Sequence, residues 1–345
     1  MSGVSTRSIA VATVAAAAAA ALPFAPVAAQ AAAPAASPKP AKAEKPALKV
    51  STAYVLPGEH VYPEGIAVDP RNGDLYAASY TEGTVFKMTR GHRVAKVFKR
   101  AGADGRTTAN GLKIDRAGRL WVTDSTHGVA VYNTRTRRLF ARFEVPGTAA
   151  RFVNDLSIAR DGSVYLTDSV REVVYRVTPT QLAGAHKSGK ATKLQARFNL
   201  TKVIKPHPAG AFTLNGIVTD PSGRYALTVD STAGELFRLD LASGKVRKVA
   251  LRGGGLVNAD GLELKNGRLW AAHNKDYAIS RWRVGAAGAS ARREAMVTSK
   301  ALELPTTLVR SNGVLYVVRS QFDKGGPMGP GTPRIPFSIA AVKGF

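Results

Sequence analysis

The chain has 345 residues, no cysteine, and 49 Lys and Arg residues against 24 Asp and Glu, which give a formal net charge of +25. The lack of cysteine excludes disulfides, thiolate metal sites and thiol nucleophiles. The basic residues are spread along the chain and form no cluster or recognition-helix pattern, so nucleic acid is not an expected partner; a solvated surface that faces an anionic cell-envelope polymer fits this charge better.

The first 31 residues have the pattern of a secretory signal peptide. Arg7 precedes an apolar, Ala/Val-rich run at 9–22, and Ala29-Gln30-Ala31 provides the small residues that cleavage requires. Pro23 ends the run, which contains little of the Leu, Ile and Phe that drive membrane insertion. We therefore expect a secreted or periplasmic protein with no membrane span after signal cleavage.

A linker and a single domain are expected to follow. Residues 32–49 are rich in Ala, Pro and Lys and show no hydrophobic period, which is typical of a disordered segment. Residues 50–345 have a length that all-β barrels and propellers often use as one domain. The predicted boundaries are thus 1–31, 32–49 and 50–345.

Similar segments recur along this domain. Each has a polar residue, usually followed by Gly, then an apolar strand with a period of two, a Gly-containing turn and a second strand. The copies are PEGIAVDPRNGDLYAAS from Pro63, ANGLKIDRAGRLWVTDS from Ala109, VNDLSIARDGSVYLTDS from Val153, LNGIVTDPSGRYALTVDS from Leu214, ADGLELKNGRLWAAHN from Ala259 and a weaker PTTLVRSNGVLYVVRS from Pro305.

We call the polar residue near the start of each copy its anchor residue. The anchors are Glu64, Asn110, Asn154, Asn215, Asp260 and Thr306, separated by 46, 44, 61, 45 and 46 residues. This spacing is typical of one propeller blade per repeat, and an apolar period of two argues against a helical solenoid. The sequence predicts an all-β, six-bladed β-propeller with four-stranded blades.

Two segments depart from the repeat. The long interval contains an insertion of about sixteen residues within 179–212, expected to be a surface excursion. The last copy is followed by a Gly/Pro-rich stretch at 321–334, expected on the mouth side as a solvated connector, with a flexible lid as the alternative. Only a short strand near 338–342 comes after it, so an N-terminal strand at about 49–56 is expected to complete the last blade and close the ring.

The anchors are expected to converge, because the first strand of each propeller blade lines the central channel. Each anchor offers an oxygen atom, and the carboxylates of Glu64 and Asp260 match the charge of a divalent cation. Calcium takes about six to eight oxygen ligands, and two facing buried carboxylates without a cation would raise the pKa of one of them. No anchor is His or Cys, which disfavours zinc and copper. One hard divalent cation, Ca²⁺ in the first instance, is predicted.

A structural role for the anchors is the competing interpretation. Asn-Gly, Asp-Gly and Glu-Gly pairs also form turns, and the chain must bend where a blade begins. The mixture of side chains favours the cation site, because a turn has no need for a carboxylate in particular blades.

Other polar residues are expected near the same mouth. Asp124, Asp168 and Asp230 end second strands, and we favour a role in bonding the backbone of the following turn. His127 and His273 lie at or just beyond strand ends, where an imidazole can shuttle a proton. Neither has a visible partner in the sequence, so the favoured interpretation is a surface-loop histidine without catalytic function. There is no G-x-S-x-G elbow to indicate a serine hydrolase.

At its anchors the sequence, over roughly residues 50–345, resembles the senescence-marker-protein/gluconolactonase family of calcium-dependent propeller hydrolases, with paraoxonase and diisopropyl fluorophosphatase as more distant relatives. The resemblance implies that Glu64, Asn154, Asn215 and Asp260 bind the metal. It further implies that Asp260 is the catalytic base in hydrolysis of a small lactone or ester.

Two features limit what the resemblance implies. The family's sugar-contacting arginine is replaced by Phe152, with Arg151 one residue further back, so sugar specificity does not carry over. The roles of Asn110 and Thr306 as further mouth residues are not fixed by it. The repeats also resemble NHL propellers, which often only bind, and the alternative function is a noncatalytic exported module for a cell-envelope polymer or a protein.

Overall fold

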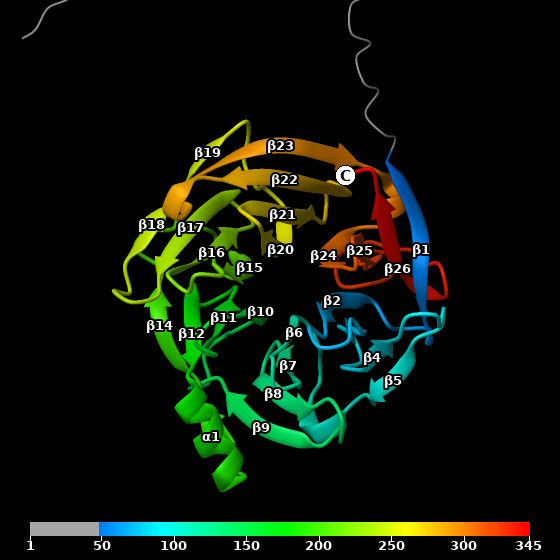
Figure 1. The fold of residues 1–345 in the computed structure, drawn as a ribbon, viewed down its shortest axis with the longest axis horizontal. Helices are drawn as coiled ribbons and strands as arrows, with labels where there is room; N and C mark the ends of the chain where they lie inside the picture. The colour runs from blue at the N-terminus through cyan, green and yellow to red at the C-terminus, as the bar shows by residue number, and fades with distance from the viewer. Residues whose placement is uncertain (1–47) are drawn as a thin grey trace, which may run out of the picture. The chain divides into compact units, whose positions relative to one another are not determined.

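The computed structural model describes residues 48–345, in which six small sheets form a ring (Figure 1). This confirms the predicted all-β, six-bladed propeller. The predicted signal peptide at 1–31 and nearly all of the predicted linker at 32–49 lie outside the described residues. No helix within residues 48–345 has the length and apolar character needed to cross a membrane.

The first three blades are numbered here in chain order from the innermost strand. Blade 1 contains β2 (Pro63–Val68), β3 (Leu75–Ser79), β4 (Val85–Met88) and β5 (Lys96–Lys99). Blade 2 contains β6 (Leu112–Ile114), β7 (Arg119–Asp124), β8 (Gly128–Asn133), β9 (Leu139–Glu144) and the added β13 (Thr192–Lys193). Blade 3 contains β10 (Val153–Ile158), β11 (Val164–Asp168), β12 (Val173–Val177) and β14 (Gln195–Asn199).

The other three blades complete the ring. Blade 4 contains β15 (Leu214–Thr219), β16 (Tyr225–Asp230), β17 (Glu235–Asp240) and β18 (Val246–Lys248). Blade 5 contains β20 (Ala259–Lys265), β21 (Arg268–His273), β22 (Ala278–Val284), β23 (Ser290–Thr298) and the added β19 (Ala250–Arg252). Blade 6 contains β24 (Pro305–Ser311), β25 (Val314–Arg319), β26 (Phe337–Lys343) and β1 (Lys49–Leu56). Short 3-10 turns occur at Ala103–Gly105, Ala286–Gly288 and Lys300–Leu302.

The ring closes as predicted, by pairing the first described strand with the last. β1 runs antiparallel to β26 in blade 6, with a register from Lys49 opposite Lys343 to Leu56 opposite Phe337 (Figure 1). β26 is thereby paired on both sides, with β25 and with β1, which protects it from pairing with another chain.

The segment at 179–212 is a surface excursion, as expected, but it is ordered and contributes strands to two blades. It begins with helix α1 (Pro179–Ser188), whose N-cap Thr178 and Gln181 form a capping box. It then supplies β13, which pairs parallel with β9 of blade 2, and β14, the outer strand of blade 3. The capping box was the signal in the sequence for this helix.

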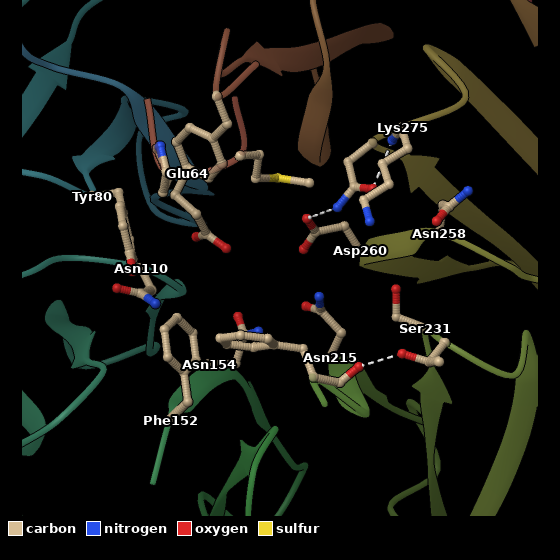
Figure 2. A pocket seen from close by; sticks show the side chains of 16 residues that line it. Glu64, Tyr80, Asn110, Phe152, Asn154, Asn215, Ser231, Asn258, Asp260 and Lys275 are labelled. Atoms are coloured by element: carbon tan, nitrogen blue, oxygen red, sulfur yellow. Dashed lines mark hydrogen bonds between the residues drawn. The ribbon is translucent and has the colours of Figure 1, made fainter. Parts of the chain in front are cut away.

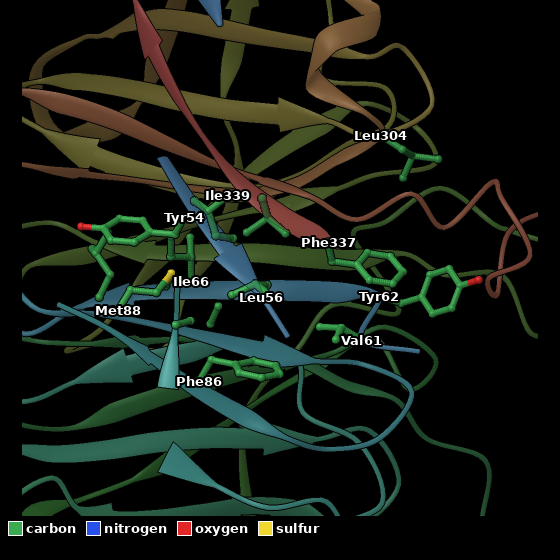
Figure 3. Packing of buried hydrophobic residues seen from close by; sticks show 14 of the residues in the cluster. Tyr54, Leu56, Val61, Tyr62, Ile66, Phe86, Met88, Leu304, Phe337 and Ile339 are labelled. Carbon is green, nitrogen blue, oxygen red and sulfur yellow. The ribbon is translucent and has the colours of Figure 1, made fainter. Parts of the chain in front are cut away.

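Apolar residues form six clusters in the described residues, one between each pair of neighbouring blades. Figure 3 shows the cluster between blades 6 and 1, where Leu56, Phe337 and Ile339 pack against Ile66 and Phe86. The clusters give each blade a hydrophobic layer on both faces. The blades therefore form one rigid frame around the channel.

Candidate metal centre at the channel mouth

Five of the six anchors lie at β-bulges in the first strands of their blades. In β2 the pairing with β3 passes from Pro63 to Ile66, so Glu64 and Gly65 fall in the irregularity. The corresponding bulges of the other strands fall at 154–155, 215–216, 260–261 and 306–307. A bulge bends a strand and redirects its side chains, so it can turn the anchor toward the channel axis.

The glycine that follows most anchors allows neighbouring inner strands to approach each other. A Cβ atom at Gly65 would lie 2.0 Å from the carbonyl oxygen of Asn110, and one at Gly216 would lie 2.3 Å from that of Asp260. These glycines therefore serve close packing of strands around the channel. The competing interpretation, in which the anchor and its glycine form a turn, does not describe β2, β15 or β20, where both residues are part of the strand.

Threonine side chains of the preceding blade hold the backbone of three anchors. Thr306 Oγ1 donates to the Glu64 carbonyl oxygen at 2.7 Å, Thr123 Oγ1 to that of Asn154 at 2.6 Å and Thr167 Oγ1 to that of Asn215 at 2.8 Å. These buried bonds fix the anchors in position before any ligand binds. Thr306 thus supports the Glu64 backbone, and it does not line the cavity as a ligand.

A second set of hydrogen bonds orients anchor side chains from the end of the second strand of the same blade. Ser125 Oγ donates to Asn110 Oδ1 at 3.2 Å, Asn154 Nδ2 donates to Ser169 Oγ at 3.0 Å, and Asn274 Nδ2 donates to Asp260 Oδ2 at 2.9 Å. The partners Ser125, Ser169 and Asn274 were not predicted from the sequence. The repeated Asp-Ser pair at 124–125 and 168–169 was the signal that could have identified two of them.

The anchors meet at a cavity of about 510 Å³ at one mouth of the channel. Its lining includes Glu64, Asn110, Asn154, Asn215 and Asp260. Figure 2 shows the side chains of Glu64, Asn154, Asn215 and Asp260 directed toward one central space from different blades. The anchors predicted from sequence to share a site are therefore together, with the exception of Thr306.

Three of these side chains carry a buried oxygen that has no hydrogen-bond partner among residues 48–345. The atoms are Glu64 Oε2, Asn154 Oδ1 and Asn215 Oδ1. An unsatisfied buried polar atom costs about 1–3 kcal/mol, so three on one space call for a ligand. Carboxylate and amide oxygens are the ligands that Ca²⁺ prefers, so the donor set fits a hard divalent cation. Asn110 differs, because its oxygen accepts from Ser125 and its Nδ2 is the unpaired atom.

The electrostatics of the cavity also fit a cation. Burial raises the pKa of Glu64 well above its usual value, and the negative charges of Asp260 and Asp155 raise it further. Burial likewise raises the pKa of Asp260 to about 7, against the lowering effect of its hydrogen bond from Asn274. A cation between the two carboxylates would offset both causes, because it favours the ionised forms.

Asn side chains are essential to this donor set. Within residues 48–345 no group of three or more His, Cys, Asp or Glu side chains is arranged to hold a metal ion. The described site contains two anchor carboxylates, and the other oxygens that face the space come from Asn154 and Asn215. Such a set is poor in the nitrogen and sulfur ligands that zinc and copper prefer.

Three other predicted mouth residues lie away from the cavity lining. His127 is bonded to Asp124 Oδ1 at 3.1 Å through Nδ1, and Arg151 donates to the carbonyl oxygens of Thr126 and Gly147. His273 is buried inside blade 5, between the Val257 carbonyl oxygen at 2.8 Å and Ser280 Oγ at 2.7 Å. The expectation of a surface-loop position for His273 was therefore wrong.

The three aspartates at the ends of second strands have the structural role that sequence analysis favoured. Asp168 Oδ1 accepts from the backbone N–H groups of Val170 and Arg171, and Asp230 Oδ1 accepts from those of Thr232 and Ala233. Asp124 accepts from the backbone N–H of Thr107 at 2.9 Å and, more weakly, from that of Thr126. Each carboxylate thereby fixes the loop around the mouth.

The segment at 321–334 forms part of the mouth. Phe322, Pro327 and Met328 line the cavity. The segment is tied down where Tyr62 donates to the Lys324 carbonyl oxygen at 3.0 Å and where Tyr277 donates to the Asp323 carboxylate. Its predicted position on the mouth side is confirmed.

Comparison with solved structures shows the propeller fold in several proteins. The Malassezia sympodialis allergen Mala s 1 has a TM-score of 0.59 and 15% identity over 85% of this chain and 96% of its own. A Xanthomonas campestris gluconolactonase has a TM-score of 0.56 and 15% identity over 86% and 89%, and a regucalcin from Agrobacterium tumefaciens, described as calcium-binding, has 0.55 and 17% over 84% and 93%. Identities this low show a common fold alone.

The family model gives the more specific result. No curated protein matches this chain. Residues 62–293 match the family model described as SMP-30/Gluconolactonase/LRE-like region, which spans five anchors from Glu64 to Asp260. The chain belongs to the SMP-30/gluconolactonase/LRE-like family, as the resemblance at its anchors implied.

Proposed function

We propose that this chain is an exported, metal-dependent hydrolase of a small lactone or ester. The observation that carries the proposal is the set of buried oxygens of Glu64, Asn154 and Asn215 that have no partner among the described residues and face one cavity. A module that only binds through its rim has no need to bury two carboxylates and two unsatisfied amides together. The family membership supports the same conclusion.

Glu64, Asn154, Asn215 and Asp260 are the residues we assign to hold a hard divalent cation, Ca²⁺ in the first instance. Such an ion, when bound, supplies Lewis-acid polarisation of an ester carbonyl. The side chains are held for this task by the hydrogen bonds from Thr306, Thr123 and Thr167 to anchor carbonyl oxygens. Little reorganisation is therefore needed when a ligand enters.

Asp260 is the proposed general base. Its Oδ2 accepts a hydrogen bond from Asn274, which orients the carboxylate of this cavity-lining residue, and we assign the other oxygen, Oδ1, to proton transfer. In the proposed step Oδ1 takes a proton from a water molecule while the water oxygen bonds to the carbonyl carbon. The acyl C–O bond then breaks, the leaving oxygen takes that proton back from Asp260 Oδ1, and a hydroxy acid or an acid and an alcohol are released.

Lactonase and arylesterase assays on the purified chain test this proposal. We expect activity that is lost on chelation, is restored by Ca²⁺, and falls about 10²- to 10⁴-fold in Asp260→Asn. Asp161→Asn is the matched control, because Asp161 is an exposed carboxylate in the β10–β11 turn, bonded to Ser163. Activity that persists after both chelation and Asp260→Asn contradicts the mechanism.

The noncatalytic alternative is supported by the surplus of basic side chains. In blade 5, for example, the one carboxylate of Glu294 pairs with Arg268, Arg281 and Arg283. Cosedimentation with an insoluble anionic cell-wall polymer at low and high salt tests this function, because surface ion contacts weaken with screening. N-terminal sequencing of the mature chain from the extracytoplasmic fraction tests the proposed export.

A further inference from the structure

Apart from the anchors, the cavity at the mouth has two walls that differ in polarity. One wall contains aromatic rings, and the other contains Ser231, Thr232, Asn258 and Lys275. In Figure 2 Tyr80 and Phe152 lie on the side of blades 1 and 3, opposite Ser231, Asn258 and Lys275. The volume of about 510 Å³ falls in the range of small-molecule sites and accommodates a substituent beyond a reacting ring.

The aromatic wall is continuous, although its four rings come from separate parts of the chain. Tyr80 follows β3, Phe152 precedes β10, Phe212 ends the inserted segment, and Phe322 follows β25. Ring centroids are 5.4 Å apart for Tyr80 and Phe322, 6.2 Å for Tyr80 and Phe152, and 4.8 Å for Phe152 and Phe212. Each ring therefore contacts the next around this side of the mouth.

Part of this wall is exposed to solvent at a cost in free energy. Phe212 is 52% exposed and Met328, which lines the same cavity, is 38% exposed. Large apolar side chains gathered at the edge of a cavity mark a binding surface more often than isolated ones do. An apolar ligand group would cover both side chains.

The angles between neighbouring rings determine which kind of ligand group can pack against this wall. A sugar ring packs well on a flat aromatic face, but neighbouring rings here are inclined by 31°, 52° and 83° and form a bent surface. The side chain of Phe152 has no hydrogen-bond donor or acceptor to offer to a ligand hydroxyl group at this position. A hydroxyl placed against Phe152, Phe212 or Phe322 would lose its bonds to water without replacement, which costs about 1–3 kcal/mol.

We propose that the substrate is a lactone or ester with an apolar alkyl or aryl substituent, which packs against Tyr80, Phe152, Phe212 and Phe322 while its carbonyl faces the anchors. This inference rests on the proposed hydrolase function and specifies its substrate class. The polar wall, with Lys275, faces the oxygen-bearing part of the molecule. A polyhydroxylated lactone would leave the aromatic wall without an apolar partner.

The test is a chain-length series on the purified full chain with Ca²⁺. γ-Lactones with side chains from methyl to heptyl are compared with glucono-δ-lactone for hydrolysis, and the matching γ-lactams, which resist hydrolysis, are used for binding by calorimetry. We expect kcat/KM and lactam affinity to rise about two- to fourfold per methylene, because each buried CH₂ is worth about 0.8 kcal/mol. Phe212→Ser and Phe152→Ala should flatten both dependences.

Phe140→Ala is the matched control, because Phe140 is a half-buried ring on the outer strand β9 that stacks on His186 far from the cavity lining. It should leave the chain-length dependence unchanged. A flat series in the native chain, glucono-δ-lactone as the best substrate, or a dependence that survives Phe212→Ser and Phe152→Ala overturns the inference. Chain-length-dependent lactam binding without hydrolysis of any lactone contradicts the proposed hydrolase but supports the apolar pocket.

Discussion

The two ends of the central channel differ in how the charges of their side chains are compensated. Both are hollow, with cavities of about 510 and 450 Å³. The first is lined by the anchors at the start of the inner strands, and the second by residues further along the same strands, such as Ile66, Leu262 and Leu308. The six inner strands therefore present two kinds of surface, one at each end.

Charged groups of the second cavity lie beside opposite charges, although Glu263 Oε2 and Arg310 Nε make no hydrogen bond within residues 48–345. Lys113 Nζ lies 3.6 Å from Asp155 Oδ1, and the Arg310 guanidinium lies 3.8 Å from Glu263 Oε2, while the Arg310 backbone N–H donates to Glu263 Oε1 at 2.8 Å. At the anchor end, Glu64 faces the like charge of Asp260. Two like charges that face each other, more than hollow volume, therefore distinguish the candidate metal centre from the second cavity.

The largest difference between the two ends is expected when the glutamate of each end, Glu64 or Glu263, is replaced by Gln. If Glu64 is a ligand, Ca²⁺ at about 100 times its Kd raises the free energy of unfolding of the native chain by about 2.7 kcal/mol. In Glu64→Gln the affinity should fall about 100-fold, which reduces the same gain to about 0.4 kcal/mol. Thermal unfolding with and without Ca²⁺ measures the difference.

Glu263→Gln is the matched control at the other end, since burial raises the pKa of both carboxyls. It should keep the full response to Ca²⁺. An equal response in Glu64→Gln and the native chain would show that the anchors do not hold the ion. In the metal-free state Glu64→Gln should be no less stable than the native chain, because it removes a buried like-charge contact.

A methyl group between inner strands should have the next largest effect. Gly216→Ala places a Cβ 2.3 Å from the Asp260 carbonyl oxygen, so blades 4 and 5 must separate, at a cost of about 1–3 kcal/mol in unfolding free energy. Activity should fall further than stability, because Asp260 moves with its backbone. Gly184→Ala, in the middle of α1 with nothing within 4 Å of the new Cβ, should stabilise slightly. Equal effects of the two would argue against close packing at the anchors.

A smaller effect is expected where a side chain only orients a ligand. Ser169→Ala removes the oxygen that accepts from Asn154 Nδ2, and Ca²⁺ affinity should fall about tenfold, as for other groups that orient metal ligands. Ser163→Ala, at the opposite end of β11 and bonded to Asp161 and Arg176, should leave affinity unchanged. Calorimetric titration with Ca²⁺ measures both variants. Unchanged affinity in Ser169→Ala would mean that Asn154 is held by its backbone alone.

Much of the fold was predictable from the sequence because the repeat encodes it locally. The period-two strands, the glycine turns and the spacing of the anchors determine the blade, and the unpaired last repeat required a closing strand at β1. Helix α1 escaped prediction, although its capping box is in the sequence, because the Lys-rich segment around it has no clear period. β13 could not be predicted, since its pairing with β9 depends on where α1 places it.

The candidate site was predictable in type and only partly in detail. Repeat position identified Glu64, Asn154, Asn215 and Asp260, because equivalent positions converge in a ring. Repeat position also placed Thr306 among the mouth residues, but its hydroxyl turns to the Glu64 carbonyl oxygen. The aromatic wall had no signal, since Tyr80, Phe152, Phe212 and Phe322 lie outside the repeat's aligned positions and meet only through tertiary structure.

His273 should affect the pH dependence of stability by the smallest amount, without a role in the reaction. Burial lowers its pKa, against the raising effects of the Val257 carbonyl and of Asp276 at 3.9 Å, while Arg293 lowers it further. As pH falls below about 6.5 the unfolded chain binds a proton that folded His273 does not, so stability is lost with acidification, by at most about 1.4 kcal/mol per pH unit.

Urea unfolding of the native chain and His273→Gln between pH 7 and 5 isolates this contribution. In the metal-free chain Asp260, whose pKa is raised to about 7, gives a slope of opposite sign, because the folded state then binds the extra proton. The difference between the two chains cancels that effect and should show the native chain losing more stability toward pH 5. Identical slopes would show that His273 is protonated in the folded state, and so closer to solvent than its bonds to Val257 and Ser280 allow.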